Sequence, residues 1–316
     1  MLSDFIFSLN AVMPIFLIML LGYAIRRAGL ATASAAMQIN TIVFRVVLPV
    51  KLFADVYATD FSQMLDFKFI AFTIGSVLIF AVICFTVAEK FIHDRKSKGA
   101  FIQGSFRGNY VILGVSLVPA ILGYMPALAA TGIIIVVPLF NILSVITLTV
   151  YGDLKLKAKN ILVSIIQSIA TNPLIIGLLS GVLISLIPVR IPQALDSSIN
   201  MVGALATPLA LIVLGANLSF SGIKERLSLS LTASALKLIA MPIIFLPLAT
   251  WFGISFEGIV VLFVLYCAPT AIVSYVMAAA MGSDEQLTSN IILITTMISV
   301  LTYTAGVYFM RVMYVI

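Results

Sequence analysis

The stretch Ser105–Gly114, SFRGNYVILG, places an arginine, a glycine and an asparagine inside an apolar run. Gly108 makes an unwound backbone inexpensive, and a helix that breaks there exposes amide N–H groups and a partial positive charge. Such helix ends bind anions. Arg107 adds a full positive charge, and Asn109 and Tyr110 add neutral hydrogen-bonding groups. These residues predict an anion-binding site at a broken helix.

A second interruption is predicted in YCAPTAIVSY, residues 266–275. Pro269 removes an amide donor and collides with the preceding helical turn. Irregular backbone inside a membrane is tolerated only where protein or a water-filled cavity satisfies it. We therefore expect the two breaks to cross near the middle of the membrane beside a cavity, with Thr270, Ser274 and Tyr275 as further donors and acceptors.

Four basic residues fall inside apolar runs, namely Arg45, Lys51, Arg107 and Lys237, whereas the acids lie mainly in loops or at the ends of runs. An ionisable group inside a membrane is costly and indicates a function, and surplus positive charge favours an anionic ligand. Structural roles are the alternatives. Lys51 either pairs with Asp55 one turn later or extends its stem toward a headgroup, and Arg45 either joins the site or reaches a lipid phosphate. Arg107 either meets the substrate or its path, or caps the end of its span, and Lys237 serves the structure.

Two prolines predict kinks in the second and seventh apolar runs. Pro49 lies in VLPVKLF and Pro208 in ATPLALIVLGANLS. A kinked helix beside the crossing point either lines the pocket or only sets the shape of the bundle. We include both prolines among the candidate site residues.

The elements that position these residues are transmembrane helices. Of the 316 residues 62% are hydrophobic and 9% charged, and the mean hydropathy of +1.21 lies outside the range of soluble domains. A spanning helix needs about 20 apolar residues. The sequence predicts an all-α integral membrane protein with spans near 6–25, 35–55, 67–89, 100–122, 127–150, 162–186, 196–218, 228–251, 256–281 and 287–311.

Basic residues predict the orientation of these spans, because Lys and Arg concentrate in alternate loops. One side carries Arg26, Arg27, Lys90, Arg95, Lys96, Lys98, Lys155, Lys157, Lys159, Lys224 and Arg226. The positive-inside rule makes that side cytoplasmic. We expect a multi-pass protein of the plasma membrane with both termini on the extracytoplasmic side. The net charge of +6 then reflects topology, and no nucleic-acid partner is expected.

A repeat is visible in the prolines and glycines. Pro14 and Pro173 are 159 positions apart, and so are Pro49 and Pro208, Gly22 and Gly181, and Gly123 and Gly282. This predicts two five-helix repeats, residues 1–157 and 158–316. An odd number of spans inserts the second copy upside down, so the repeats are inverted, an arrangement typical of transporters.

Several segments resemble the auxin efflux carrier family of plant PIN-type carriers and bacterial permeases for malonate or malate. They are LPVKLF, RGNYVILGVSL, PLALIVLGANLS and CAPTAIVSYVMAAAMGSDEQLTSNIILITTMISVLT. The resemblance covers essentially the whole chain. It identifies Asn109 and Pro269 as the two crossover residues. Where PIN-like carriers have a proline after that asparagine, this chain has Tyr110, a departure that counts against auxin-like specificity.

The resemblance also implies an architecture. It is a ten-helix fold like that of bile acid sodium symporters and sodium/proton antiporters, with broken crossover helices 4 and 9. Spans 1, 2, 6 and 7 would form a scaffold that makes a homodimer. Spans 3–5 and 8–10 would form a transport domain that moves in an elevator-like manner.

The expected function is secondary or facilitative transport of a small organic anion, either a malonate- or malate-type carboxylate or an auxin-like acid. No cofactor is expected, and coupling to Na⁺ or H⁺ stays open because the crossover contains no Asp or Glu. An intramembrane enzyme is disfavoured, since the only histidine, His93, lies in a basic loop and no H-E-x-x-H occurs. A channel would need repeated pore-lining stripes. A transport-incompetent receptor of the same fold is the remaining alternative.

Overall fold

The structure is a computed structural model of the chain. It describes residues 2–57, 66–110, 117–119, 121–124, 126–152, 166–167, 170–187, 191–217 and 223–314. Within these ranges the chain is helical, and the one β-type contact is an isolated bridge between Gly108 and Thr270. The all-α class predicted from the sequence is therefore confirmed for the described residues.

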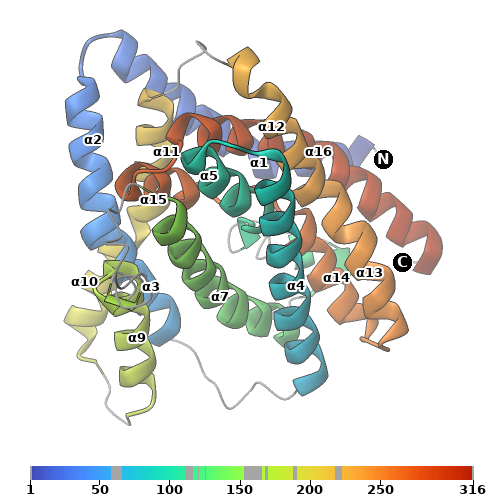
Figure 1. The fold of residues 1–316 in the computed structure, drawn as a ribbon. Coiled ribbons are helices and arrows are strands. Elements are labelled where there is room, and N and C mark those ends of the chain that lie inside the picture. The colour runs from blue at the N-terminus through green and yellow to red at the C-terminus, as the bar shows by residue number, and fades with distance from the viewer. Residues whose placement is uncertain are drawn as a thin grey trace.

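The helices follow one another along the chain as the colours of Figure 1 show. The first half contains α1 (Leu2–Arg27), α2 (Ala33–Ile42), the π-helical turn η1 (Val43–Val47), α3 (Leu48–Tyr57), α4 (Phe67–Phe91), α5 (Arg95–Phe106) and α7 (Ala127–Tyr151). The second half contains α9 (Pro173–Ser185), α10 (Gln193–Ala204), α11 (Ala206–Ala216), α12 (Ile223–Ala235), the π-helical turn η4 (Leu236–Ala240), α13 (Met241–Trp251), α14 (Phe256–Cys267), α15 (Val273–Met281) and α16 (Glu285–Tyr314).

Helix length and composition fit a bilayer. Among the described residues five helical stretches are long and apolar enough to cross a membrane: Phe67–Phe91, Ala127–Tyr151, Gln193–Ala216, Arg226–Trp251 and Glu285–Tyr308. Large apolar side chains such as Leu183, Met201 and Trp251 are exposed on the outside of the bundle. This is what lipid, rather than water, requires of a protein surface.

Local sequence signals explain where several helices begin and end. The Asn172 side chain accepts a hydrogen bond from the Leu174 amide at the start of α9, and Pro173 occupies the first turn, where no amide is needed. Gly282 ends α15 with φ of +73°, and Gly123 also has a positive φ, of +80°. Both glycines therefore adopt a left-handed conformation that other residues rarely accept.

Buried apolar side chains form two clusters. The first, the α4–α16 cluster, joins side chains of α4, α5, α7, α12, α13, α14 and α16. The second, the α1–α11 cluster, joins α1, η1, α3, α9 and α11 and also takes side chains from α7, α15 and α16. Figure 1 shows α2, α3, α9 and α10 at the left and α4, α13 and α14 at the right, with α7 between them. The core thus forms two clusters, and α7 and α16 contribute side chains to both.

Two pairs of helices in the α1–α11 cluster approach each other through glycine. A Cβ atom added to Gly22 of α1 would lie 2.2 Å from the carbonyl oxygen of Ile212 in α11. A Cβ atom added to Gly181 of α9 would lie 2.8 Å from the carbonyl oxygen of Phe53 in α3. Small residues permit such backbone contact between membrane helices. Gly181 lies 159 positions after Gly22, and Ile212 lies 159 positions after Phe53, so the two contacts correspond.

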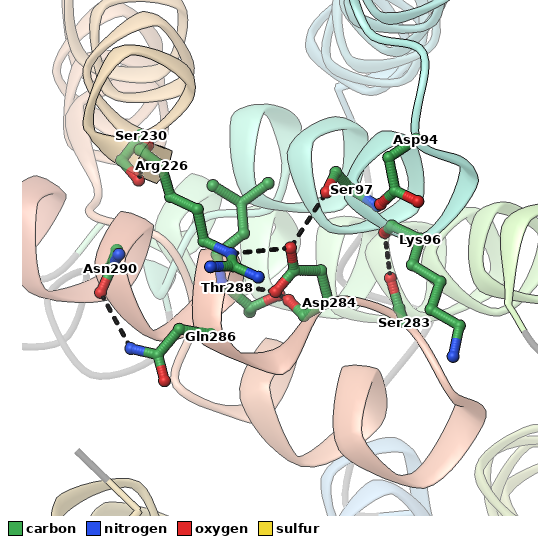
Figure 2. Close-up of polar contacts among 11 residues, drawn as sticks. Asp94, Lys96, Ser97, Arg226, Ser230, Ser283, Asp284, Gln286, Thr288 and Asn290 are labelled. Carbon is green, nitrogen blue, oxygen red and sulfur yellow. Dashed lines mark hydrogen bonds and ion pairs between the residues drawn. The ribbon is translucent and has the colours of Figure 1, made fainter. Parts of the chain in front are cut away.

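Asp284 joins three helices through hydrogen bonds to its carboxylate (Figure 2). Its carboxylate accepts hydrogen bonds from the Leu287 amide in the first turn of α16, from the Ser97 hydroxyl of α5 at 3.0 Å and from Arg226 Nε of α12 at 3.0 Å. Nearby, Asp94 caps α5, and hydrogen bonds from Ser97 hold the pKa of the Asp94 carboxyl below its usual range. Three helices therefore start from one polar cluster.

Gly22→Ala tests the close contact between α1 and α11. The added methyl group must push the two backbones apart, so we expect the protein to lose about 1–3 kcal/mol of stability. Gly75→Ala in α4 is the matched control, because nothing lies within 4 Å of its added Cβ. That control should be neutral or slightly stabilising in thermal unfolding of the detergent-solubilised protein. Equal melting temperatures for both variants would contradict the contact.

Asp284→Ala tests the polar cluster of Figure 2. Loss of a helix cap costs about 0.5–2 kcal/mol, and Ser97 and Arg226 lose an acceptor as well, so the melting temperature should fall. Asp284→Asn retains a capping oxygen and removes only the charge. A partly exposed ion pair contributes little. The loss of stability in Asp284→Asn should therefore be less than half of the loss in Asp284→Ala. An equal loss in both variants would show that charge, and not capping, dominates.

Candidate functional site

The two helix breaks meet in space. Helix α5 ends at Phe106, α14 ends at Cys267, and α15 begins only at Val273. Between them the chain forms a short antiparallel bridge. The Asn109 amide donates to the Pro269 carbonyl oxygen at 2.8 Å, and the Ala271 amide donates to the Arg107 carbonyl oxygen at 3.2 Å. We call residues 107–109 and 268–272 the crossover.

Side chains around the crossover explain why it forms there. Pro269 has no amide to leave unpaired, and its carbonyl is used by Asn109. The Thr270 hydroxyl donates to the Gly104 carbonyl oxygen at 2.7 Å, and the Thr270 amide donates to the Thr295 hydroxyl at 3.1 Å. Backbone groups freed by the break therefore find partners inside the protein, as a membrane interior requires.

A cavity of about 100 Å³ lies against the crossover, enough space for several water molecules or a small ligand. Its wall combines the crossover with α3, α7, α9 and α11. The lining residues are Leu48, Lys51, Leu52, Asp55, Arg107, Gly108, Asn109, Tyr110, Val136, Val137, Phe140, Asn141, Leu174, Ala206, Thr207, Ala271 and Val273. The cavity thus lies where α3, α9 and α11 meet α7 and the crossover.

Positive charge exceeds negative charge on the cavity wall. Arg107 is 4% exposed; its guanidinium donates to the Asn141 side-chain oxygen at 2.9 Å and lies against the Met277 sulfur. No described carboxylate pairs with it. Across the cavity, Lys51 forms an ion pair with Asp55, which confirms that expectation. One lysine and one arginine against one aspartate leave a single positive charge.

Asn109 is available to a ligand. Its backbone amide is held in the crossover bridge, but its half-buried side-chain amide has no hydrogen-bond partner among the described residues. An amide carries both donor and acceptor groups. Next to the Arg107 guanidinium, it offers a second donor to any oxyanion in the cavity.

The comparisons with known proteins identify the family of the chain. A model of the membrane transport protein family matches residues 7–167 and 157–306. The chain belongs to this family. The resemblance to auxin efflux carriers is thereby confirmed. With its apolar helices, the chain is a multi-pass membrane transporter.

Two relatives match nearly the whole chain. One, named "Putative malonate transporter", is from Rhizobium meliloti and is 26% identical over 312 residues, 95% of each chain. The other is an uncharacterized transporter from Methanocaldococcus jannaschii, 25% identical over 299 residues, which are 93% of this chain and 96% of the relative. Both names describe transporters.

The structure brings part of the predicted site together in the transporter. Arg107, Gly108, Asn109 and Tyr110 all line the cavity. Pro269 and Thr270 form the bridge behind it. Ser274 and Tyr275 are buried in α15 and do not line the cavity. The Ser274 hydroxyl has no hydrogen-bond partner among the described residues.

The remaining three candidates lie on the outside. Arg45 is exposed and, with Pro49, borders a groove between α3 and α9 on the outer face of the bundle. Pro208 is exposed on α11. None of the three lines the cavity, although their neighbours Leu48, Ala206 and Thr207 do.

Sequence reasoning missed the contribution of α7. Phe140 and Asn141 line the cavity, and Asn141 holds the Arg107 guanidinium. The available signal was a lone asparagine in the apolar run PLFNIL, residues 138–143. Its importance depends on how α7 packs beside the crossover, which the sequence does not show.

Proposed function

We propose that this transporter carries a small carboxylate, malonate or a close dicarboxylate, across the plasma membrane, binding it at the crossover beside Arg107 and Asn109. The observation that supports this is the buried Arg107 guanidinium, which faces the cavity without a carboxylate partner among the described residues. The name of the relative from Rhizobium meliloti supports the choice of malonate.

Physical chemistry favours an anion at this position. A buried cation without a counter-ion carries a large desolvation cost, which a bound carboxylate offsets. Guanidinium groups bind carboxylates through two parallel hydrogen bonds. Arg107 uses one nitrogen on Asn141 and has further N–H groups to offer. An auxin-like acid presents the same carboxylate, so the matched comparison is between small and aromatic acids.

We propose an elevator-like mechanism, which the two clusters of the core support. We assign α1, α2, α3, α9, α10 and α11 to a scaffold, and α4, α5, α7 and α12–α16 to a transport domain. The α4–α16 cluster belongs entirely to the transport domain, and the cavity lies where the two groups of helices meet. Movement of one group along the other would carry the crossover from one side of the membrane to the other.

The inverted repeat supports this mechanism. Under the 159-residue shift, the contact of Gly22 with Ile212 becomes the contact of Gly181 with Phe53. The same shift relates the left-handed glycines Gly123 and Gly282. Two halves of equivalent packing and opposite direction can exchange conformations, which opens a shared site to either side in turn. We therefore propose ten spans in two inverted repeats, residues 1–157 and 158–316.

Membrane orientation and assembly complete the proposal. The loop charges favour both termini on the extracytoplasmic side. The family resemblance favours a homodimer formed through the scaffold. The comparisons name transporters and give no support to the alternative receptor function.

Arg107→Gln tests whether the guanidinium binds the anion. Malonate affinity of the purified protein should fall at least tenfold, because the buried positive charge that attracts the carboxylate is gone. Arg27→Gln is the control, since Arg27 is exposed at the end of α1 and contacts Tyr23 far from the cavity-lining residues in the chain. Calorimetric titration with malonate, malate, acetate and an indole acid measures affinity and selectivity together. An unchanged malonate affinity in Arg107→Gln contradicts the proposed site.

Asn109→Ala and Asn109→Asp separate hydrogen bonding from charge at the second donor. The alanine variant loses a hydrogen bond to a charged group, worth about 1.5–3 kcal/mol, so affinity should fall by about tenfold or more. Asn109→Asp adds a negative charge on a side chain of nearly the same size as asparagine, and it should abolish malonate uptake into proteoliposomes. Uptake by Asn109→Asp at the wild-type rate would exclude a carboxylate at this position.

A further inference from the structure

Lys237 lies directly behind the crossover. The residue is in the π-helical turn η4, and its side chain is fully buried at 0% exposure. A Cβ atom added to Gly108 would lie 3.0 Å from its Nζ atom. The amine is also 6.0 Å from the centre of the Phe140 ring. Gly108 and Phe140 both line the cavity, so Lys237 is separated from it by one layer of atoms.

The surroundings of the amine contain no described acidic group. Its contacts are the Leu265 carbonyl oxygen of α14 at 3.4 Å and the Met241 sulfur of α13 at 3.6 Å, both long for hydrogen bonds. None of the described carboxylates pairs with it. The ammonium form is therefore buried with weak partners.

Other titratable and charged groups face the amine from the elements packed against η4. They are the Cys84 thiol of α4, the Cys267 thiol of α14, the Tyr303 hydroxyl of α16, which donates to the Val264 carbonyl oxygen, and Arg107 on the far side of Gly108. From α5 and α7 the neighbours are the backbone around Gly108 and the Phe140 ring. The thiols in their ordinary neutral form do not compensate the charge of the ammonium.

We propose that Lys237 is the proton-binding residue that couples anion transport to proton movement, an inference that rests on the proposed anion transport. In the empty carrier burial disfavours the charged form of the amine and no described acid balances it, so the amine releases its proton more readily than an exposed lysine does. When an anion enters the cavity, its charge attracts the ammonium through a medium of low dielectric constant. The amine then takes one proton from water, and it returns that proton when the anion leaves.

This cycle balances in charge. Binding one anion adds its negative charges and one proton on Nζ, and release on the other side returns both. A monoanion is thereby carried without net charge, and a dianion with one net negative charge. The inside-negative membrane potential opposes anion uptake, and the bound proton reduces that opposition. Lys237 thus supplies coupling without an acid in the crossover.

A purely structural Lys237 would behave differently. A permanent ammonium at the C-terminal end of α14 would stabilise the partial negative charge of that helix end, and its charge would not depend on the anion. The difference lies in the number of protons exchanged on binding. That number is the readout that separates the two roles.

The test is calorimetric titration of the detergent-solubilised protein with malonate in pairs of buffers that differ in ionisation enthalpy. The two apparent enthalpies give the protons taken up per malonate bound. Between about pH 8 and pH 10 malonate is a dianion, and uptake should rise toward about one proton as the empty carrier loses its own. Lys237→Met removes the amine at similar size. Lys237→Arg keeps a permanent charge. Lys68→Met, at an exposed lysine, is the control.

The expected result is proton uptake in the wild type and in Lys68→Met, and none in Lys237→Met or Lys237→Arg. Lys237→Met should also bind malonate at least tenfold more weakly at pH 7. If Lys237→Met does not fold, Lys237→Arg and the wild type decide the question. Malonate binding without proton uptake by the wild type, or undiminished uptake in Lys237→Arg, overturns the role of Lys237 and leaves the anion site intact. Absence of malonate binding overturns both proposals.

Discussion

The crossover bridge is the interaction on which the rest of the structure depends. Two hydrogen bonds, from Asn109 to Pro269 and from Ala271 to Arg107, join chain segments that are 160 and 164 positions apart. They give partners to backbone groups of the crossover, where α5 and α14 end inside the bundle. A cavity lies beside these helix ends, and charged side chains line it.

The charges around the bridge follow from its geometry. Arg107 faces the cavity in front and Lys237 lies behind Gly108, while Lys51 is balanced by Asp55 on the opposite wall. A Cβ atom added at position 108 would lie 3.0 Å from the Lys237 Nζ atom and 3.2 Å from the Ala268 Cβ atom, so a larger residue would need these neighbours to shift. The same glycine that permits the break therefore brings two basic residues close to one site. Each part of the proposed mechanism, anion binding and proton coupling, uses one of them.

Sequence reasoning could predict the parts of the site that depend on residue type. Glycine and proline mark the helix breaks, and the 159-residue shift relates the two halves, so Gly108, Asn109 and Pro269 were identifiable. The pair Lys51–Asp55 followed from i,i+4 spacing. The side of the helix to which a side chain points was less predictable. Arg45 lies in the π-helical turn η1, which changes the register of the faces that follow it, and its side chain is exposed.

Contacts between distant helices account for what the sequence did not show. The role of Lys237 depends on its contact with Gly108, which is 129 positions away. The role of Asn141 depends on its hydrogen bond to Arg107. Neither residue has a local pattern that separates it from a packing residue. A cryo-electron microscopy map of the protein with saturating malonate tests the central claim most directly. We predict carboxylate density within hydrogen-bonding distance of the Arg107 guanidinium and the Asn109 side chain. An empty cavity, with malonate bound elsewhere on the protein, would contradict the account.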